Sequence, residues 1–91
     1  MVKINRLIWD EWNLNHIAKH GVSKKEVEIA VGDKRAVIWK HRGRYVMVAS
    51  SHGRVLFIVL EKVRGEKNAY YVITARDATN SEKRIYRTRG K

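Results

Sequence analysis

The segment Thr74–Thr79, which follows an apolar strand late in the chain, contains the residue types that hold phosphate groups. In it Arg76 and Asp77 stand just before a basic helix that also carries Glu82 and Tyr86. A guanidinium group presents a fork of donors that matches phosphate oxygens. Arg76 is therefore the first candidate for stabilising negative charge on a phosphate. Its alternative role is an ion pair with Asp77 or Glu82.

The charge of the chain favours a polyanionic partner. The 20 Lys and Arg residues outnumber the 9 Asp and Glu residues, which gives a formal net charge of +11 on 91 residues. Such an excess attracts nucleic acid, and the alternative is a solvated cationic surface that only keeps the protein in solution. The candidates for contacts with a nucleic-acid backbone, and so for RNA binding if the partner is RNA, are two arginines that follow glycine turns and three cations of the last helix: Arg44, Arg54, Lys83, Arg84 and Arg87.

Length and composition predict a single small domain over residues 1–91. The longest apolar run, Val55–Leu60, is too short to cross a membrane, and the first residues lack the apolar region of a signal peptide. The chain contains no cysteine, so disulfides and thiolate metal ligands are excluded. We therefore expect a cytoplasmic protein that does not bind membranes.

Local signals predict two helices near the start of the chain, after a short strand at Lys3–Trp9. Asp10 stands where a helix N-cap belongs, and the helix that follows should run from Glu11 to His20. The segment Ser23–Glu26 is a capping box that starts a second helix, which ends near Val31 before a glycine. Together these segments predict a helical hairpin.

The remainder of the chain reads as strands followed by a third helix. Short glycine-containing turns separate the strands and predict an antiparallel meander of four strands: 36–41, 45–50, 55–62 and 69–75. The last two strands are apolar on both faces, so both faces of the sheet should be covered. The hairpin can cover one face, and the other needs the last helix, a second subunit or a protein partner. The last helix starts with a capping box at Thr79–Glu82.

The expected fold class is α+β, with an N-terminal strand and a helical hairpin packed on a four-stranded antiparallel sheet and a basic C-terminal helix. Four segments on this plan resemble the BrnT family of ribonuclease toxins in order and spacing: Trp9-Asp10, Lys19-His20-Gly21-Val22, Gly53-Arg54-Val55-Leu56, and Thr74-Ala75-Arg76-Asp77-Ala78 followed by Glu82 and Tyr86. The resemblance implies a RelE-like fold and a type II toxin that cleaves RNA, inhibits translation and is neutralised by a DNA-binding antitoxin. With an antitoxin the expected assembly is a toxin–antitoxin hetero-oligomer, and a homodimer is the alternative.

Cleavage of RNA without a metal requires a base for the ribose 2′-hydroxyl, charge stabilisation at the phosphate and a proton for the leaving oxygen. His20 is the candidate acid or base, because an imidazole exists in both forms near neutral pH. Its alternative role is to interact with the carbonyl groups at the end of a helix. Lys19 could hold a phosphate or remain solvated. Tyr86 could contact the substrate or anchor the core.

A metal site is the weaker chemical alternative. His16 and His20 lie four residues apart on one helix, a spacing that lets two imidazoles share an ion, but nothing in the sequence fixes a third ligand. We therefore expect neither a metal nor another cofactor. The tryptophans Trp9, Trp12 and Trp39 are interpreted as core or interface residues, and not as surfaces on which bases stack.

The sequence thus predicts a metal-independent ribonuclease toxin with Arg76 and His20 meeting in one pocket, and with RNA and an antitoxin as partners. One alternative is a nucleic-acid-binding module, or a toxin-like protein that has kept the fold without the nuclease activity. Another is an interaction protein that assembles through the second face of its sheet. Cleavage of RNA separates the first hypothesis from the others.

Overall fold

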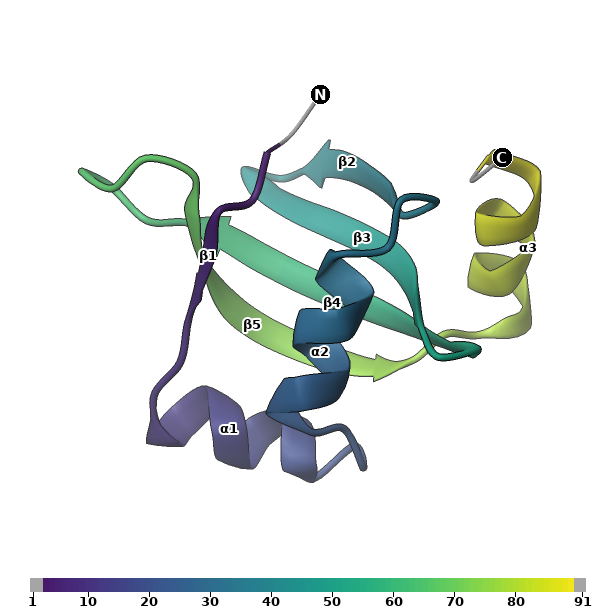
Figure 1. The fold of residues 1–91 in the computed structure, drawn as a ribbon, viewed down its shortest axis with the longest axis horizontal. Coiled ribbons are helices and arrows are strands. Elements are labelled where there is room, and N and C mark those ends of the chain that lie inside the picture. Colours follow the sequence, from purple (N-terminus) through teal and green to yellow (C-terminus); the bar gives the residue numbers. More distant parts are fainter. Residues whose placement is uncertain (1–2, 90–91) are drawn as a thin grey trace.

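A five-stranded mixed sheet forms the centre of the molecule, and three helices surround it (Figure 1). The computed structural model describes residues 3–89. Their elements, in chain order, are β1 (Arg6–Ile8), α1 (Glu11–Ala18), α2 (Lys24–Val31), β2 (Val37–His41), β3 (Arg44–Ser51), β4 (Arg54–Lys62), β5 (Ala69–Asp77) and α3 (Asn80–Arg89). The order in the sheet is β1-β5-β4-β3-β2. The α+β class is confirmed.

The N-terminal strand corrects the predicted four-stranded sheet. Strand β1 does not lie apart from the meander but pairs in parallel with the start of β5, with Leu7 opposite Tyr70. The other neighbouring strands of the sheet pair antiparallel, as the short turns predict. The sequence could not show the fifth pairing, because β1 and β5 are joined by most of the chain and by no turn signal.

The helix starts follow the predicted capping signals. Asp10 caps α1 by accepting a hydrogen bond from the Asn13 backbone N–H, and the Asn13 side chain accepts one from the Asp10 N–H. The buried Asn13 amide also donates to the Ile8 carbonyl at 2.9 Å, which joins α1 to the end of β1. Ser23 and Glu26 form the same reciprocal box at α2. Helix α1 ends at Ala18 and not at His20 as predicted, and a turn follows.

The main core lies between the sheet and the two hairpin helices. Leu56, Ile58 and Leu60 alternate along β4 and are completely buried, and they pack in one cluster with Ile17 of α1 and Val27 of α2. This face is called the hairpin face below. Because side chains alternate along a strand, the intervening residues of β4 point to the other side, which is called the second face.

The second face is only partly covered. Helix α3 packs near β3 and β2, and Val48 on this face is completely buried. Phe57 and Val59 of β4 remain half-buried. Helix α3 contributes no buried residue, so polar contacts must help to hold it in place. None of the helices formed by residues 3–89 is long and apolar enough to span a membrane.

Candidate nucleic-acid interface

A hollow of about 360 Å³ lies between α3 and the turn that joins β3 to β4. The turn is tight, because His52 and Gly53 both take left-handed backbone conformations, with φ of 49° and 89°. Helix α3 contributes Lys83, Tyr86 and Arg87, which are three and four residues apart and therefore lie on one face of the helix. The residues around the hollow are Gly53, Arg54, Val55, Asp77, Lys83, Tyr86 and Arg87.

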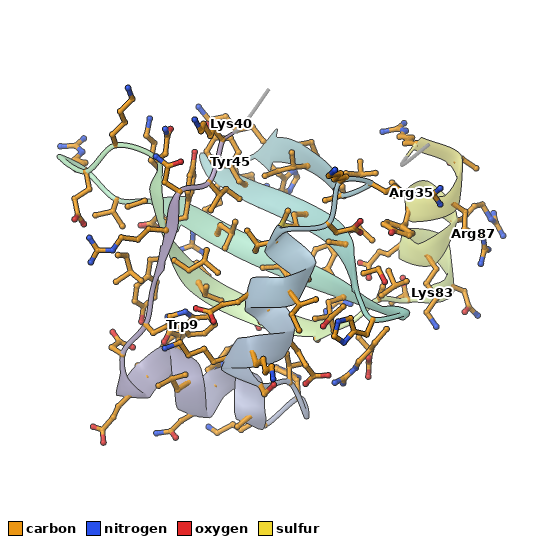
Figure 2. The ribbon with its side chains drawn as sticks, in the orientation of Figure 1. Trp9, Arg35, Lys40, Tyr45, Lys83 and Arg87 are labelled. Atoms are coloured by element: carbon orange, nitrogen blue, oxygen red, sulfur yellow. The ribbon has the colours of Figure 1, made fainter. Side chains whose placement is uncertain are left out.

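The hollow brings together four of the residues predicted from the sequence. Arg54, Lys83 and Arg87 were candidate RNA contacts, and Tyr86 was a candidate catalytic residue. Figure 2 shows the side chains of Lys83 and Arg87 projecting from α3. A larger hollow of about 510 Å³ is lined by residues 62–68, at the end of β4 and in the β4–β5 loop, and contains none of the predicted site residues.

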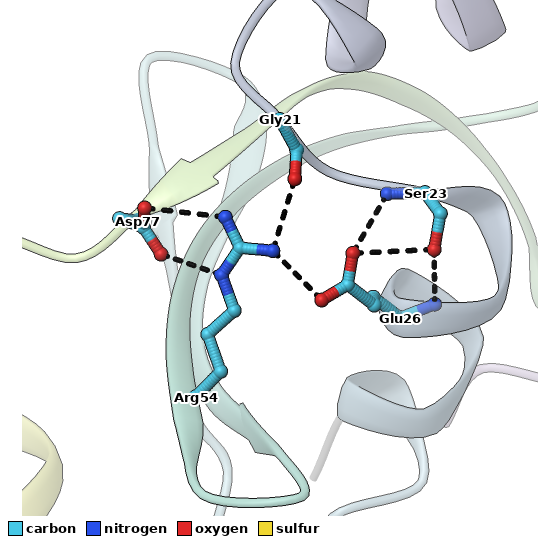
Figure 3. A network of polar contacts seen from close by, with 5 residues as sticks. All are labelled: Gly21, Ser23, Glu26, Arg54 and Asp77. Carbon is cyan, nitrogen blue, oxygen red and sulfur yellow. Dashed lines mark hydrogen bonds and ion pairs between the residues drawn. The ribbon is translucent and has the colours of Figure 1, made fainter.

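Arg54 forms one wall of this hollow and is held from three sides (Figure 3). Its Nε and Nη2 donate to the two carboxylate oxygens of Asp77 at 2.7 and 3.2 Å. Its Nη1 donates to the Gly21 carbonyl at 3.0 Å and to Glu26 Oε2 at 2.7 Å. The hydrogen bonds from Arg54 lower the pKa values of Glu26 and of Asp77 below their usual ranges. Every nitrogen of this guanidinium is therefore engaged, and it serves as a tie between the hairpin and the end of β5.

Arg76 is engaged in the ion pair that was its alternative role. Its Nη1 and Nη2 donate to the two oxygens of Glu82 at 2.9 and 3.0 Å, and its guanidinium lies 4.1 Å from the centre of the Phe57 ring. Burial raises the pKa of Glu82, but the hydrogen bonds from Arg76 and from the Thr79 N–H outweigh this effect and leave the pKa lowered. The pair thus fixes the start of α3 against β5.

His20 and Arg76 do not share a pocket in this structure. Arg76 alternates with the buried Ala75 and stacks on Phe57, which places its side chain on the second face of the sheet. His20 follows α1, which belongs to the hairpin face, and its exposed ring packs edge-on against His16 at 5.5 Å. The predicted meeting of the two side chains is therefore wrong. In the sequence both residues stand near the end of a helix or a strand, but the alternation of side chains along β5 places Arg76 on the second face, away from the hairpin that carries His20.

The connection of His20 to the hollow is indirect. Its neighbour Gly21 accepts the hydrogen bond from Arg54, so the end of α1 lies beside the wall of the hollow. Lys19 is also exposed and caps α1 by its backbone N–H. These two residues lie at the edge of the candidate interface and not inside it.

The Tyr86 hydroxyl has a structural partner. It donates to Asp33 Oδ2 at 2.7 Å, and the same oxygen accepts a hydrogen bond from the Ser50 backbone N–H at 2.9 Å. Burial, followed by this hydrogen bond to Asp33, raises the pKa of Tyr86. Tyr86 thus joins α3 to the loop after α2 and to β3.

The two remaining candidate RNA contacts lie elsewhere. Arg44 pairs with Glu61 at 3.3 Å and starts β3, whereas the hollow adjoins the end of that strand. An eight-residue strand separates these points by roughly 24 Å. Arg84 is exposed on α3 but does not line the hollow.

A stack of two rings on α1, the exposed Trp12 and the half-buried His16, was not predicted from the sequence. Trp12 stacks on His16 with ring centres 4.8 Å apart and an angle of 8° between their planes. Trp12 is 56% exposed and is therefore not a core residue, so of the two predicted roles only the interface role stays open for it, whereas Trp9 packs against the core as expected. The spacing of four residues along the helix was the available signal, but it was considered only as a metal motif. Within residues 3–89, no three His, Asp or Glu side chains converge as metal ligands would.

Comparison with known families adds an independent finding. The family described as "Ribonuclease toxin, BrnT, of type II toxin-antitoxin system" matches the chain over residues 9–82. This match begins directly after β1, extends to the first turn of α3 and includes both arginine networks. None of the curated proteins compared with the chain matches it.

Proposed function

Because the chain belongs to the BrnT family of ribonuclease toxins of type II toxin–antitoxin systems, we propose that it is a metal-independent endoribonuclease that acts in the cytoplasm and inhibits translation. The backbone phosphate of the RNA binds in the hollow between α3 and the β3–β4 turn. An antitoxin partner, which the family implies, neutralises the toxin by covering this hollow in a hetero-oligomer.

The unequal pairing of charges in the hollow carries this proposal. Arg54 is shared between Asp77 and Glu26, whereas Lys83 and Arg87 make no ion pair with any residue from 3 to 89. The lining of the hollow sets three cations, Arg54, Lys83 and Arg87, against the single carboxylate of Asp77, and so has a formal net charge of +2. Lys83 and Arg87 are the two of these cations that form no ion pair within residues 3–89. Two such cations match one phosphate group, and they can stabilise the additional negative charge that develops when the 2′-hydroxyl attacks it.

The other predicted residues receive different roles. We propose His20 as the acid or base at the edge of the hollow, with Lys19 as an additional phosphate contact. Arg76 acts as a positioning residue, because its pair with Glu82 fixes the start of the helix that carries Lys83 and Arg87. Tyr86 positions the same helix through Asp33.

The test is cleavage of single-stranded RNA by the purified protein in the presence of EDTA. We expect cleavage to persist with EDTA, and the double substitution Lys83→Ala/Arg87→Ala to lower kcat/KM by roughly 100-fold or more, as the loss of a charge-stabilising donor does elsewhere. The matched control is Arg64→Ala/Lys67→Ala. It removes the same charge from the β4–β5 loop, at the other end of the sheet, and should change kcat/KM little.

Three results would contradict the proposal. Loss of cleavage with EDTA would refute the metal-independent mechanism. An equal decrease for both double variants would show that the hollow has no special role and that only net charge matters. No cleavage of any RNA would leave the second candidate, an RNA-binding protein without nuclease activity, which is favoured by the separation of His20 from Arg76 on different sides of the sheet.

A further inference from the structure

We propose that the exposed face of α1 is a stacking platform for a base of single-stranded RNA, centred on Trp12 and extended by His16 and His20. This inference rests on the proposed function, since it assigns a second contact for the same RNA. It concerns the bases of the RNA, whereas the hollow concerns its phosphates.

The geometry of the rings carries the proposal. The Trp12 and His16 rings are nearly parallel at 4.8 Å, which is the arrangement of stacked bases, and His20 packs edge-on against His16. One face of the Trp12 ring is used by His16, and the side chain is still 56% exposed. Its free surface can take a base and continue the stack. An aromatic ring offers such stacking to any base, because every base has a π-face.

The platform is held rigidly by the opposite side of its helix. Asn13 and Ile17 are almost completely buried, and the reciprocal cap between Asp10 and Asn13 fixes the first turn. A ring on this helix therefore loses little freedom when a base binds. Rigid aromatic groups contribute more affinity for the same contact area.

The position and charge of the platform favour RNA over a second copy of the chain. Its far end, His20, stands next to Gly21, which contacts the Arg54 wall of the hollow. From Trp12 to Ala18, the last residue of α1, the helix rises by about 9 Å, and His20 follows in the next turn, so one RNA strand can reach both surfaces. The net charge of +11 opposes self-association and attracts a polyanion.

A shared metal ion explains the same rings less well. The imidazoles of His16 and His20 are related edge-to-face, with a plane angle of 78°. Trp12 cannot act as a ligand, and no group of three ligands occurs in the part of the chain that the structure describes. A stack, in contrast, uses all three rings.

The test compares two short labelled ligands with the same number of phosphates: a 2′-O-methyl oligoribonucleotide, which cannot be cleaved through its 2′ position, and an abasic oligomer. We expect the wild-type protein to bind the base-containing ligand roughly 5-fold or more tightly than the abasic ligand. This preference is at the lower end of what one stacked base contributes, because His16 already occupies one face of the Trp12 ring. The preference should not change with salt, since both ligands release the same counterions.

The variants separate stacking from general apolar contact. Trp12→Ala should bind both ligands equally, and Trp12→Phe should keep most of the preference. Leu14→Ala is the matched control, because Leu14 is a 37% exposed apolar residue on the same helix without a ring, and it should behave as the wild type. Circular dichroism confirms that each variant is folded.

The proposal is overturned if the wild type binds both ligands equally, or if Trp12→Ala keeps the full preference. A third contrary result is a Trp12→Ala variant that keeps the preference for the base-containing ligand but no longer binds the antitoxin that co-purifies with the wild type. In that case α1 would be a surface for docking a protein. A protein that prefers the base-containing ligand but leaves ordinary RNA uncut supports the platform and refutes the nuclease, so the two proposals fail separately.

Discussion

Replacement of Arg54 by methionine tests the network that joins the hairpin to the sheet. The substitution keeps the apolar stem and removes two ion pairs and the hydrogen bond to the Gly21 carbonyl. The side chains are partly exposed, at 31% for Arg54, 33% for Glu26 and 63% for Asp77. Solvent therefore screens each pair, and each contributes about 0.2–1 kcal/mol.

The hydrogen bond to Gly21 adds about 1 kcal/mol, so the expected loss in the free energy of unfolding is about 2 kcal/mol. For a domain of this size, this loss lowers Tm by about 10 °C. Urea denaturation at pH 7, followed by circular dichroism, measures the difference. Arg44→Met is the control, because its pair with Glu61 is longer, at 3.3 Å, and half-exposed. It should cost about 0.5 kcal/mol or less.

The dependence on pH provides a second readout of the same variant. Glu26 and Asp77 have pKa values below their usual 4.5 and 3.8, so their ion pairs stabilise the protein above those values and lose this effect as the pH falls through the lowered pKa values. The difference in the free energy of unfolding between the wild type and Arg54→Met should therefore become smaller below about pH 4.5. A difference in stability that stays constant down to pH 3, or no difference at pH 7, would refute this account of the network.

Two further substitutions test the contacts that hold α3. Arg76→Ala leaves the Glu82 side chain, which is only 17% exposed, without its arginine partner, and should lower the free energy of unfolding measured in urea by about 1–2 kcal/mol. The added substitution Glu82→Gln should restore part of this stability. No recovery would show that the ion pair is not the cause of the loss. Tyr86→Phe removes the hydroxyl that donates to Asp33 and should cost about 1 kcal/mol while leaving kcat for RNA cleavage unchanged. A decrease in kcat of tenfold or more at full saturation with RNA would assign this hydroxyl to the substrate instead.

The features predicted correctly from the sequence depend on residues close together in the chain. The capping boxes at Ser23 and Thr79 each join residues three positions apart, and both are present: Ser23 accepts from the Glu26 N–H at 3.2 Å and Thr79 from the Glu82 N–H at 3.3 Å. The meander is also correct, because each of its turns carries its own glycine signal. Such features need no knowledge of the tertiary fold.

The features missed from the sequence depend on pairs of residues far apart in the chain. Nothing local indicates that β1 adds to β5, or that Arg54 selects Glu26 and Asp77 from the carboxylates of the chain. The error over His20 and Arg76 has the same origin. Ala75, the residue before Arg76, points to the hairpin face, so a shift of one position along β5 decides on which side of the sheet a side chain lies.

The two arginine networks meet at Asp77 and together determine the shape of the hollow. The Asp77 carboxylate accepts from Arg54, and its carbonyl accepts from Arg76 Nη1 at 3.1 Å. A continuous chain of polar contacts therefore runs from the capping box of α2, through the end of β5, to the capping box of α3.

Helix α3 buries no residue completely, so these partly exposed polar contacts contribute much of what holds Lys83 and Arg87 beside the β3–β4 turn. Regions held in this way open at a lower free energy than the apolar core. We therefore expect α3 to be released before the sheet unfolds, and this release would remove both cations from the hollow in a single step.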